Sequence, residues 1–262
     1  MERGKLAYGG VPLVRIAGVL IALMLAVGLN ARVAQAIPIT FTTSGTVPST
    51  GDTVSASAEF TVLSGGNLQI VLTNTTSGGT LANGDALTDL FFTVIAADPV
   101  LAMSSATGNT LNPSATGVDL KAVNKGDGTW EFVGHPGSTF GVNENGVNFP
   151  YEYGLSTAGD GGLFNGDLID GPDYHIVAAG TDLNLDGLKN FPAVDTSATF
   201  VISGYSGLTE ANIRNVAFSF GTTPDLVSEG GGPPQQVIPE PTTVALLGIG
   251  LCGLLLGKRR KG

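Results

Sequence analysis

The sequence predicts an all-β protein: an antiparallel, jelly-roll-like β-sandwich with a signal helix before it and a transmembrane helix after it. In the body of the chain, apolar and polar residues alternate with a period of two, which is typical of strands with one buried face. Clusters of Gly, Asn, Asp, Ser and Thr separate these segments and favour turns. Only residues 207–213 suggest a helical turn, with Thr209 as its cap. Short strands with frequent turns indicate two packed sheets.

The clearest strands form a hairpin. Residues 54–62 carry apolar side chains at even positions, residues 64–67 form a polar turn, and residues 68–73 run back. These segments belong to one predicted ectodomain, residues 37–226. Further strands are expected at 87–95, 130–133, 174–178, 198–203 and 216–221.

The first 36 residues have the pattern of a secretory signal peptide. Arg3, Lys5 and Arg15 precede an apolar segment, residues 16–29. Ala34 and Ala36 then supply the small residues of a signal-peptidase site. We therefore expect cleavage after Ala36, with an uncleaved membrane anchor as the alternative.

A second apolar segment predicts a transmembrane helix at 242–257. Its residues 242–256 would rise roughly 23 Å as a helix, which is short for a hydrocarbon core of about 30 Å. The basic residues that follow should stay in the cytoplasm, so the ectodomain should face outward. Residues 227–238, which contain several glycines and prolines, form the expected linker. The basic residues are Lys258, Arg259, Arg260 and Lys261.

Pro239, Glu240 and Pro241 stand directly before this apolar segment. A Pro-Glu-Pro motif, a short apolar span and a basic end resemble the PEP-CTERM sorting signal of bacteria with an outer membrane. The resemblance implies that the membrane protease-transpeptidase exosortase removes the tail, residues 239–262, near the motif. The ectodomain would then be released or attached at the cell surface, so that the helix is a temporary anchor.

The ectodomain also has a family resemblance of its own. Residues 164–177, 198–204 and 213–222 are similar to the C-terminal half of a recurrent group of exosortase-dependent surface proteins. That group has no established biochemical activity. The resemblance therefore implies a surface β domain and transfers no catalytic residue.

The charge of the exported part excludes several classes of partner. Residues 37–238 contain 20 acidic and 4 basic residues, which gives a formal net charge of −16. This charge repels nucleic acids and anionic lipid surfaces. Cys252 is the only cysteine and lies in the apolar tail, so the ectodomain has no disulfide bond.

One loop has oxygen ligands at the spacing that calcium sites use. Asp182, Asn184 and Asp186 alternate before Gly187, and Asn190 occupies the ninth position. The pattern resembles the opening of EF-hand and dockerin-type calcium loops, which makes Ca²⁺ the candidate cofactor. The twelfth position is Ala193 rather than an acidic residue, and this favours a solvated turn over a calcium site. A second acidic loop nearby contains Asp167, Asp170 and Asp173.

Two further sets of residues suggest carbohydrate chemistry. Alternating aromatic side chains either stack on sugars or form a core. Any two of three glutamates could serve as the acid and base of a glycoside hydrolase. The aromatic set is Trp130, Phe132, Phe149, Tyr151 and Tyr153; the glutamates are Glu131, Glu144 and Glu152.

No nucleophile elbow, phosphate loop or dinucleotide fingerprint occurs, and His135 and His175 do not make a zinc motif. We therefore predict an exported, non-enzymatic protein that is structural or adhesive, at the cell envelope or in an extracellular polysaccharide matrix. The alternatives are a calcium-dependent carbohydrate-binding module and a hydrolase of the matrix polysaccharide.

Overall fold

The computed structural model describes parts of the second of two units, residues 37–262; the first unit is residues 1–36. The predicted signal peptide, Asp186, Asn190 and the whole tail lie outside the described residues. The described ranges are 37–47, 50–96, 99–112, 114–121, 129–134, 151–157, 173–184, 188–189, 192–221 and 225–229.

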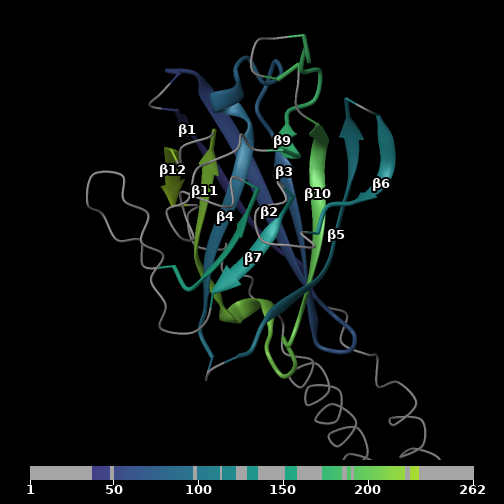
Figure 1. Ribbon diagram of the computed structural model, residues 1–262. Helices are drawn as coiled ribbons and strands as arrows, with labels where there is room; N and C mark the ends of the chain where they lie inside the picture. Colours follow the sequence, from purple (N-terminus) through teal and green to yellow (C-terminus); the bar gives the residue numbers. More distant parts are fainter. Residues whose placement is uncertain are drawn as a thin grey trace, which may run out of the picture. The chain divides into compact units, whose positions relative to one another are not determined.

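The described residues fold almost entirely as strands, with two short 3-10 helices, η1 and η2 (Figure 1). This confirms the predicted all-β class. In chain order the elements are β1 Ile39–Thr46, β2 Thr53–Leu63, β3 Asn67–Asn74, η1 Asn83–Asp85, β4 Leu87–Val94, β5 Ala102–Leu111, β6 Ala115–Asp119, β7 Glu131–Gly134, β8 Tyr153–Ser156, β9 His175–Val177, β10 Ala193–Ser203, η2 Glu210–Asn212, β11 Ile213–Phe220 and β12 Asp225–Glu229.

Hydrogen bonds link the strands into one folded-over sheet with two layers. The back sheet has the order β1-β2-β3-β10-β5-β6, and the front sheet has the order β12-β11-β4-β8-β7. The short strand β9 joins them, because it pairs in parallel with β10 and by a single bridge, Leu87 to Ile176, with β4. Every other strand pairing among the described residues is antiparallel. At the opposite side β1 lies close to β12, which narrows the open edge of the sandwich.

Period-two alternation produces the back sheet. In β2, Val54, Ala56, Ala58 and Phe60 are buried, while the residues between them are partly or fully exposed. The neighbouring strand β3 has the same alternation, and its register with β2 turns both apolar sets to one side. Burial of these side chains is the main favourable contribution to folding, at about 25 cal/mol for each Å² of apolar surface.

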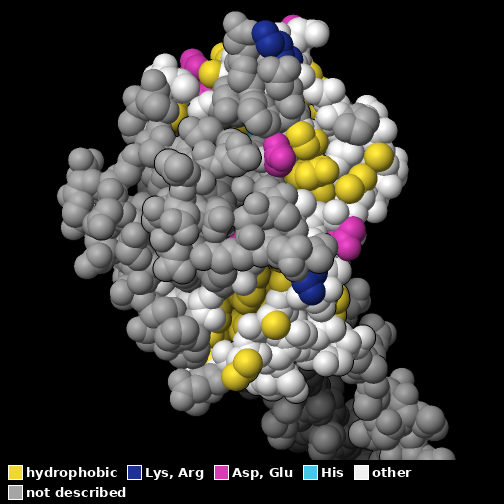
Figure 2. Space-filling view, in the orientation of Figure 1, with side chains coloured by type: hydrophobic (Ala, Val, Ile, Leu, Met, Phe, Trp, Pro, Cys, Tyr) yellow, Lys and Arg dark blue, Asp and Glu magenta, His cyan; other side chains and the backbone are white. Residues whose placement is uncertain are grey.

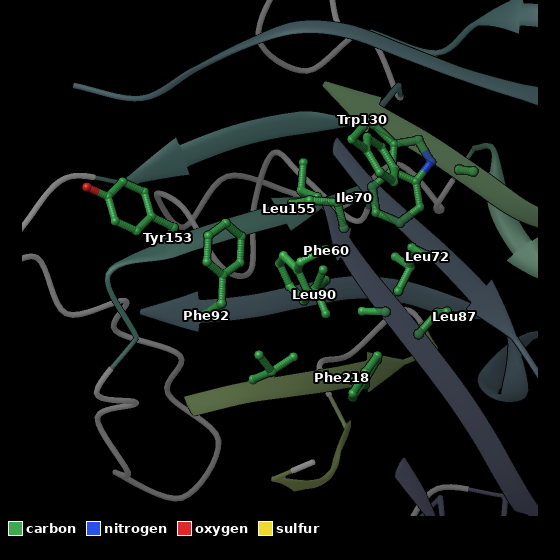
Figure 3. Close-up of a cluster of buried hydrophobic side chains, with 14 of the residues drawn as sticks. Phe60, Ile70, Leu72, Leu87, Leu90, Phe92, Trp130, Tyr153, Leu155 and Phe218 are labelled. Atoms are coloured by element: carbon green, nitrogen blue, oxygen red, sulfur yellow. The ribbon is translucent and has the colours of Figure 1, made fainter. Parts of the chain in front are cut away.

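The two sheets meet in a large apolar core (Figure 3). Phe60 of the back sheet meets Phe92 of the front sheet edge to face, with ring centroids 5.5 Å apart. Trp130, directly before β7, approaches Phe200 of β10 at 4.9 Å, and its indole N–H donates to the carbonyl of Tyr174. Such offset and edge contacts suit the quadrupoles of aromatic rings.

Strand β10 pairs with β5 along one side and with β9 and then β3 along the other, and it contains a bulge between the last two stretches. Its residues 193–195 pair with β9, and residues 197–202 pair with β3. Between the two stretches Thr196 has a φ of 64°. A positive φ is unfavourable for a β-branched residue, and the strand pairing on both sides holds Thr196 in this conformation.

The turn after β3 is fixed by a buried amide. Asn74 is 2% exposed, and its Nδ2 donates to the carbonyl oxygen of Ile176 at 3.0 Å and to that of Asp85 at 3.4 Å. Its Oδ1 accepts from the backbone N–H of Thr76. One side chain therefore connects the end of β3 with β9 and η1. Asn74 opens the only glycosylation sequon of the sequence, and its burial argues against a glycan there.

The structure agrees with the predicted strands and adds others. All seven predicted segments contain strands, and η2 lies in the predicted helical turn, where the Asn212 side chain accepts from the Thr209 N–H. Five strands were not predicted: β1, β5, β6, β8 and β12. Strand β12 runs to Glu229, into the segment expected to be linker. Within the described ranges no helix has the length and apolar character needed to cross a membrane.

Replacement of Asn74 by Ala should destabilise the protein by about 2 kcal/mol, because the buried carbonyl of Ile176 loses its donor. Urea denaturation of the full chain would measure this. Thr75→Ala is the matched control in the same sequon: its hydroxyl bonds Ser55 at the exposed surface, so the expected loss is below about 0.5 kcal/mol. Equal losses in both variants would contradict the role given to Asn74.

Candidate functional site

The described part of the predicted calcium loop forms a tight polar turn. Asp182 and Asn184 are exposed, and Asp182 Oδ1 accepts from both the backbone N–H and the side-chain Nδ2 of Asn184, each at 2.9 Å. These hydrogen bonds lower the pKa of Asp182, so its carboxylate is ionised at neutral pH. Asp186 and Asn190 lie outside the described residues, so the complete ligand set stays a prediction.

The described aromatic residues lie inside the protein. Trp130 and Tyr153 are fully buried, and Tyr151 is 2% exposed and stacks on Phe91. Phe132 is partly buried, and its ring stacks on that of Tyr153. These four side chains therefore belong to the interior, which agrees with the core interpretation and not with sugar stacking. Phe149 lies outside the described residues.

Two of the three predicted glutamates can be placed. Glu131 begins β7 and is paired in register with Ser156, whereas Glu152 directly precedes β8 at its other end. Because a strand rises about 3.3 Å per residue, the two glutamates are roughly 13 Å apart along β8. Glycosidase carboxyl groups are about 5 to 10 Å apart. This pair therefore lacks the expected spacing, and Glu144 is outside the described residues.

The front sheet contains a buried carboxyl group that is not among the predicted site residues. Asp89, the third residue of β4, is fully buried. It is paired in register with Ser156 of β8 on one side and with Ser219 of β11 on the other. The hydroxyl of Ser156 donates to Asp89 Oδ1, and that of Thr88 donates to Oδ2 at 2.8 Å. The visible signal was a lone acidic residue in the apolar segment Leu87–Val94.

Burial raises the pKa of Asp89 from 3.8 to about 6, because the charged form loses its hydration. The hydrogen bonds from Ser156 and Thr88 act in the opposite direction, since they stabilise the carboxylate. Asp89 thus titrates near neutral pH in the interior. It is positioned to stabilise the front sheet, because its hydroxyl donors come from its own strand and from β8.

Asp52 and Asp85 form a neighbouring acidic pair. The His, Cys, Asp and Glu side chains of the described ranges form no group of three or more that could hold a metal ion. On the face shown in Figure 2, the charged side chains of these residues lie apart from one another. Of the second acidic loop only Asp173 is described, and its carbonyl oxygen accepts from the Thr157 hydroxyl.

The decisive comparison concerns the tail. Residues 237–261 match the family model described as the PEP-CTERM protein-sorting motif. The chain carries a PEP-CTERM tail. The matched range contains Pro239, Glu240 and Pro241 and the basic block from Lys258 to Lys261. The predicted recognition is therefore confirmed.

The PEP-CTERM tail supports export of the protein, exosortase-dependent sorting and a surface or membrane-associated location. The match covers 25 of the 262 residues and does not describe the ectodomain. No curated protein and no solved structure matches the chain significantly. The resemblance of the ectodomain to exosortase-dependent surface proteins thus stays a prediction.

Asp89→Asn should change how stability depends on pH. Since the folded-state pKa of about 6 exceeds 3.8, the wild type binds a proton on folding between these values. Its stability relative to the variant should be greatest below about pH 3.8 and should fall by roughly 3 kcal/mol as the pH rises past about 6.

Urea denaturation of both proteins at a series of pH values would test this difference. Asp182→Asn is the control, because the pKa of this exposed carboxyl group is lowered and the sign of its contribution is opposite. A wild-type minus Asp89→Asn difference that does not vary with pH would show that Asp89 ionises normally in the folded state.

Proposed function

We propose that the protein is a non-enzymatic structural or adhesive component of the cell surface or of an extracellular polysaccharide matrix. The match to the PEP-CTERM motif carries this proposal, because it supports delivery of the chain to the surface by exosortase. The ectodomain combines a strongly acidic composition with a disulfide-free β-sandwich. Such a charge keeps a surface domain soluble and separates it from anionic lipid.

The placement of the reactive side chains supports a role without catalysis. The described aromatic residues pack in the interior, and the hydroxyls of Ser156 and Thr88 engage the Asp89 carboxyl group. Glu131 and Glu152 are separated along β8. The described residues therefore supply a stable scaffold more readily than an acid–base pair.

The proposed route has two processing steps. Signal peptidase cleaves after Ala36, and the helix at 242–257 then holds the ectodomain at the membrane. Exosortase removes this helix near Pro239, Glu240 and Pro241, and the ectodomain is released or attached. The basic block, residues 258–261, keeps the end of the tail in the cytoplasm until then.

Replacement of Pro239, Glu240 and Pro241 by alanine should block the exosortase step. The variant should accumulate in the membrane fraction at the larger, unprocessed mass, while the wild type reaches the surface or the medium. Immunoblots of cell fractions from an exosortase-containing host would measure both. Replacement of Pro233 and Pro234 in the preceding segment is the matched control, and it should leave sorting unchanged. Equal processing of both variants would contradict the assignment of the motif.

A calcium-dependent carbohydrate-binding module is the second candidate, favoured by the ionised, exposed carboxylate of Asp182. Calcium would then raise the melting temperature of the wild type but not of Asp182→Ala, because carboxylate oxygens are preferred ligands of this ion. Asp119→Ala, in the exposed edge strand β6, is the control. A melting temperature that neither calcium nor a chelator changes would eliminate this candidate.

A further inference from the structure

The outer side of the back sheet is covered by hydroxyl groups. The alternation that buries Phe41, Ala58 and Phe200 turns the intervening Thr and Ser residues away from the core. We call this surface the hydroxyl face. Its members come from β1, β2, β3, β10 and β5: Thr40, Thr42, Ser44, Ser57, Thr61, Thr73, Ser197, Thr199, Ser105 and Thr107.

Strand register arranges these hydroxyls in rows across the sheet. Thr42 is paired with Ser57, Ser57 with Thr73, and Thr73 with Ser197. This row therefore crosses four neighbouring strands, which lie side by side in Figure 1. In the adjacent row Thr199 is paired with Thr107. Neighbouring strands are about 4.8 Å apart, and successive outward residues of one strand about 6.6 Å, so the hydroxyls form a regular grid.

The hydroxyl face is accessible to a partner. Thr40, Thr42 and Thr107 are exposed, and Ser57, Thr73 and Thr199 are partly exposed. Across the described residues no side-chain hydrogen bond occupies the hydroxyls of the row from Thr42 to Ser197. Five strands and about six residues along each strand give an area of roughly 20 by 20 Å. This area is wide enough for an extended polymer chain.

The hydroxyl face is almost uncharged, unlike the rest of the ectodomain. Only Glu59 carries a charge among the outward residues of five strand segments. These segments are 40–46, 53–61, 67–73, 197–203 and 105–109. Residues 37–238 as a whole have a net charge of −16. Most acidic residues therefore lie elsewhere, and this surface carries little charge, with Glu59 on it and Asp119 of β6 beside Thr107 at its edge.

We propose that the hydroxyl face binds an uncharged polysaccharide chain. Each Ser or Thr hydroxyl both donates and accepts a hydrogen bond, as sugar hydroxyls do. The methyl groups of the threonines, together with Val71 and Val201, offer apolar contact to the C–H groups of the sugar rings. An anionic polymer would be repelled by the surrounding charge, and so would a second copy of this acidic ectodomain. The neutral polymer is thus the occupant that the charge distribution favours.

This inference rests on the proposed function, since it names the polymer class that a surface adhesin of this kind would hold. The test is affinity electrophoresis of the full chain in gels that contain hydroxyethyl cellulose or dextran, with alginate as the anionic polymer. A zwitterionic detergent keeps the tail soluble and, unlike a glycoside detergent, does not compete as a sugar. Both neutral gels should be run, and retardation in at least one is expected, with none in alginate.

The variant with Thr42→Val, Thr73→Val and Thr199→Val removes three hydroxyls and keeps the β-branched shape. Its apparent affinity for the retarding polymer should fall by at least about tenfold, since three hydrogen bonds are lost. Thr93→Val is the matched control, because Thr93 is partly exposed on β4 of the front sheet, away from the hydroxyl face. It should bind like the wild type. Equal melting temperatures would show that all variants are folded.

Two outcomes would overturn the inference. The first is a failure of the binding test: neither neutral polymer changes the mobility of the wild type, or the triple variant is retarded as strongly as the wild type. The other is wild-type self-association in sedimentation runs without polymer, lost in the triple variant, which would assign the hydroxyl face to a second copy. Cell fractionation reports on exosortase sorting separately. A protein that is sorted correctly but fails in the gels would therefore leave the proposed function standing.

Discussion

The whole ectodomain depends on the burial of two apolar sheet surfaces against each other. The described residues contain no cysteine, so no disulfide bond supplements this contact. Phe60 and Phe92 meet across the sheets, and Trp130 covers Phe200 at the same core. In β1, β2, β3 and β10 this packing buries one side of the strand and leaves the other side at the surface.

Two polar side chains that enter the interior are each held by several hydrogen bonds. Asn74 bonds two carbonyl groups and one N–H, and Asp89 receives hydroxyl donors from two strands. A buried polar group with partners fixes one register, because a slip of one residue would leave it unpaired at a cost of about 1 to 3 kcal/mol. Apolar packing favours the observed strand register, and the hydrogen bonds of Asn74 and Asp89 make that register specific.

The alternation of apolar and polar residues made many strands predictable. Features that depend on which strands pair could not be predicted. Residues 54–62 predict β2 clearly, because their buried positions are apolar throughout. Strand β1 was missed because the inward Thr43 breaks that pattern, and β5 because small or polar residues such as Ala106 and Thr110 fill its inner positions. The PEP-CTERM motif could be recognised because it is contiguous. The hydroxyl face and the surroundings of Asp89 could not, because they need the register of strands distant in sequence.

The position of β10 has a consequence for the order of folding. This strand lies in the centre of the back sheet, between β3 and β5, although it follows both far along the chain. The N-terminal hairpin therefore cannot gain its main neighbour until most of the polypeptide has been synthesised. Such long-range pairing slows collapse to the native state and lengthens the time during which the chain stays extended. The predicted signal peptide implies a chain that is threaded through a channel before it folds, and for such a route this delay would be an advantage, because an extended chain passes more easily than a closed domain.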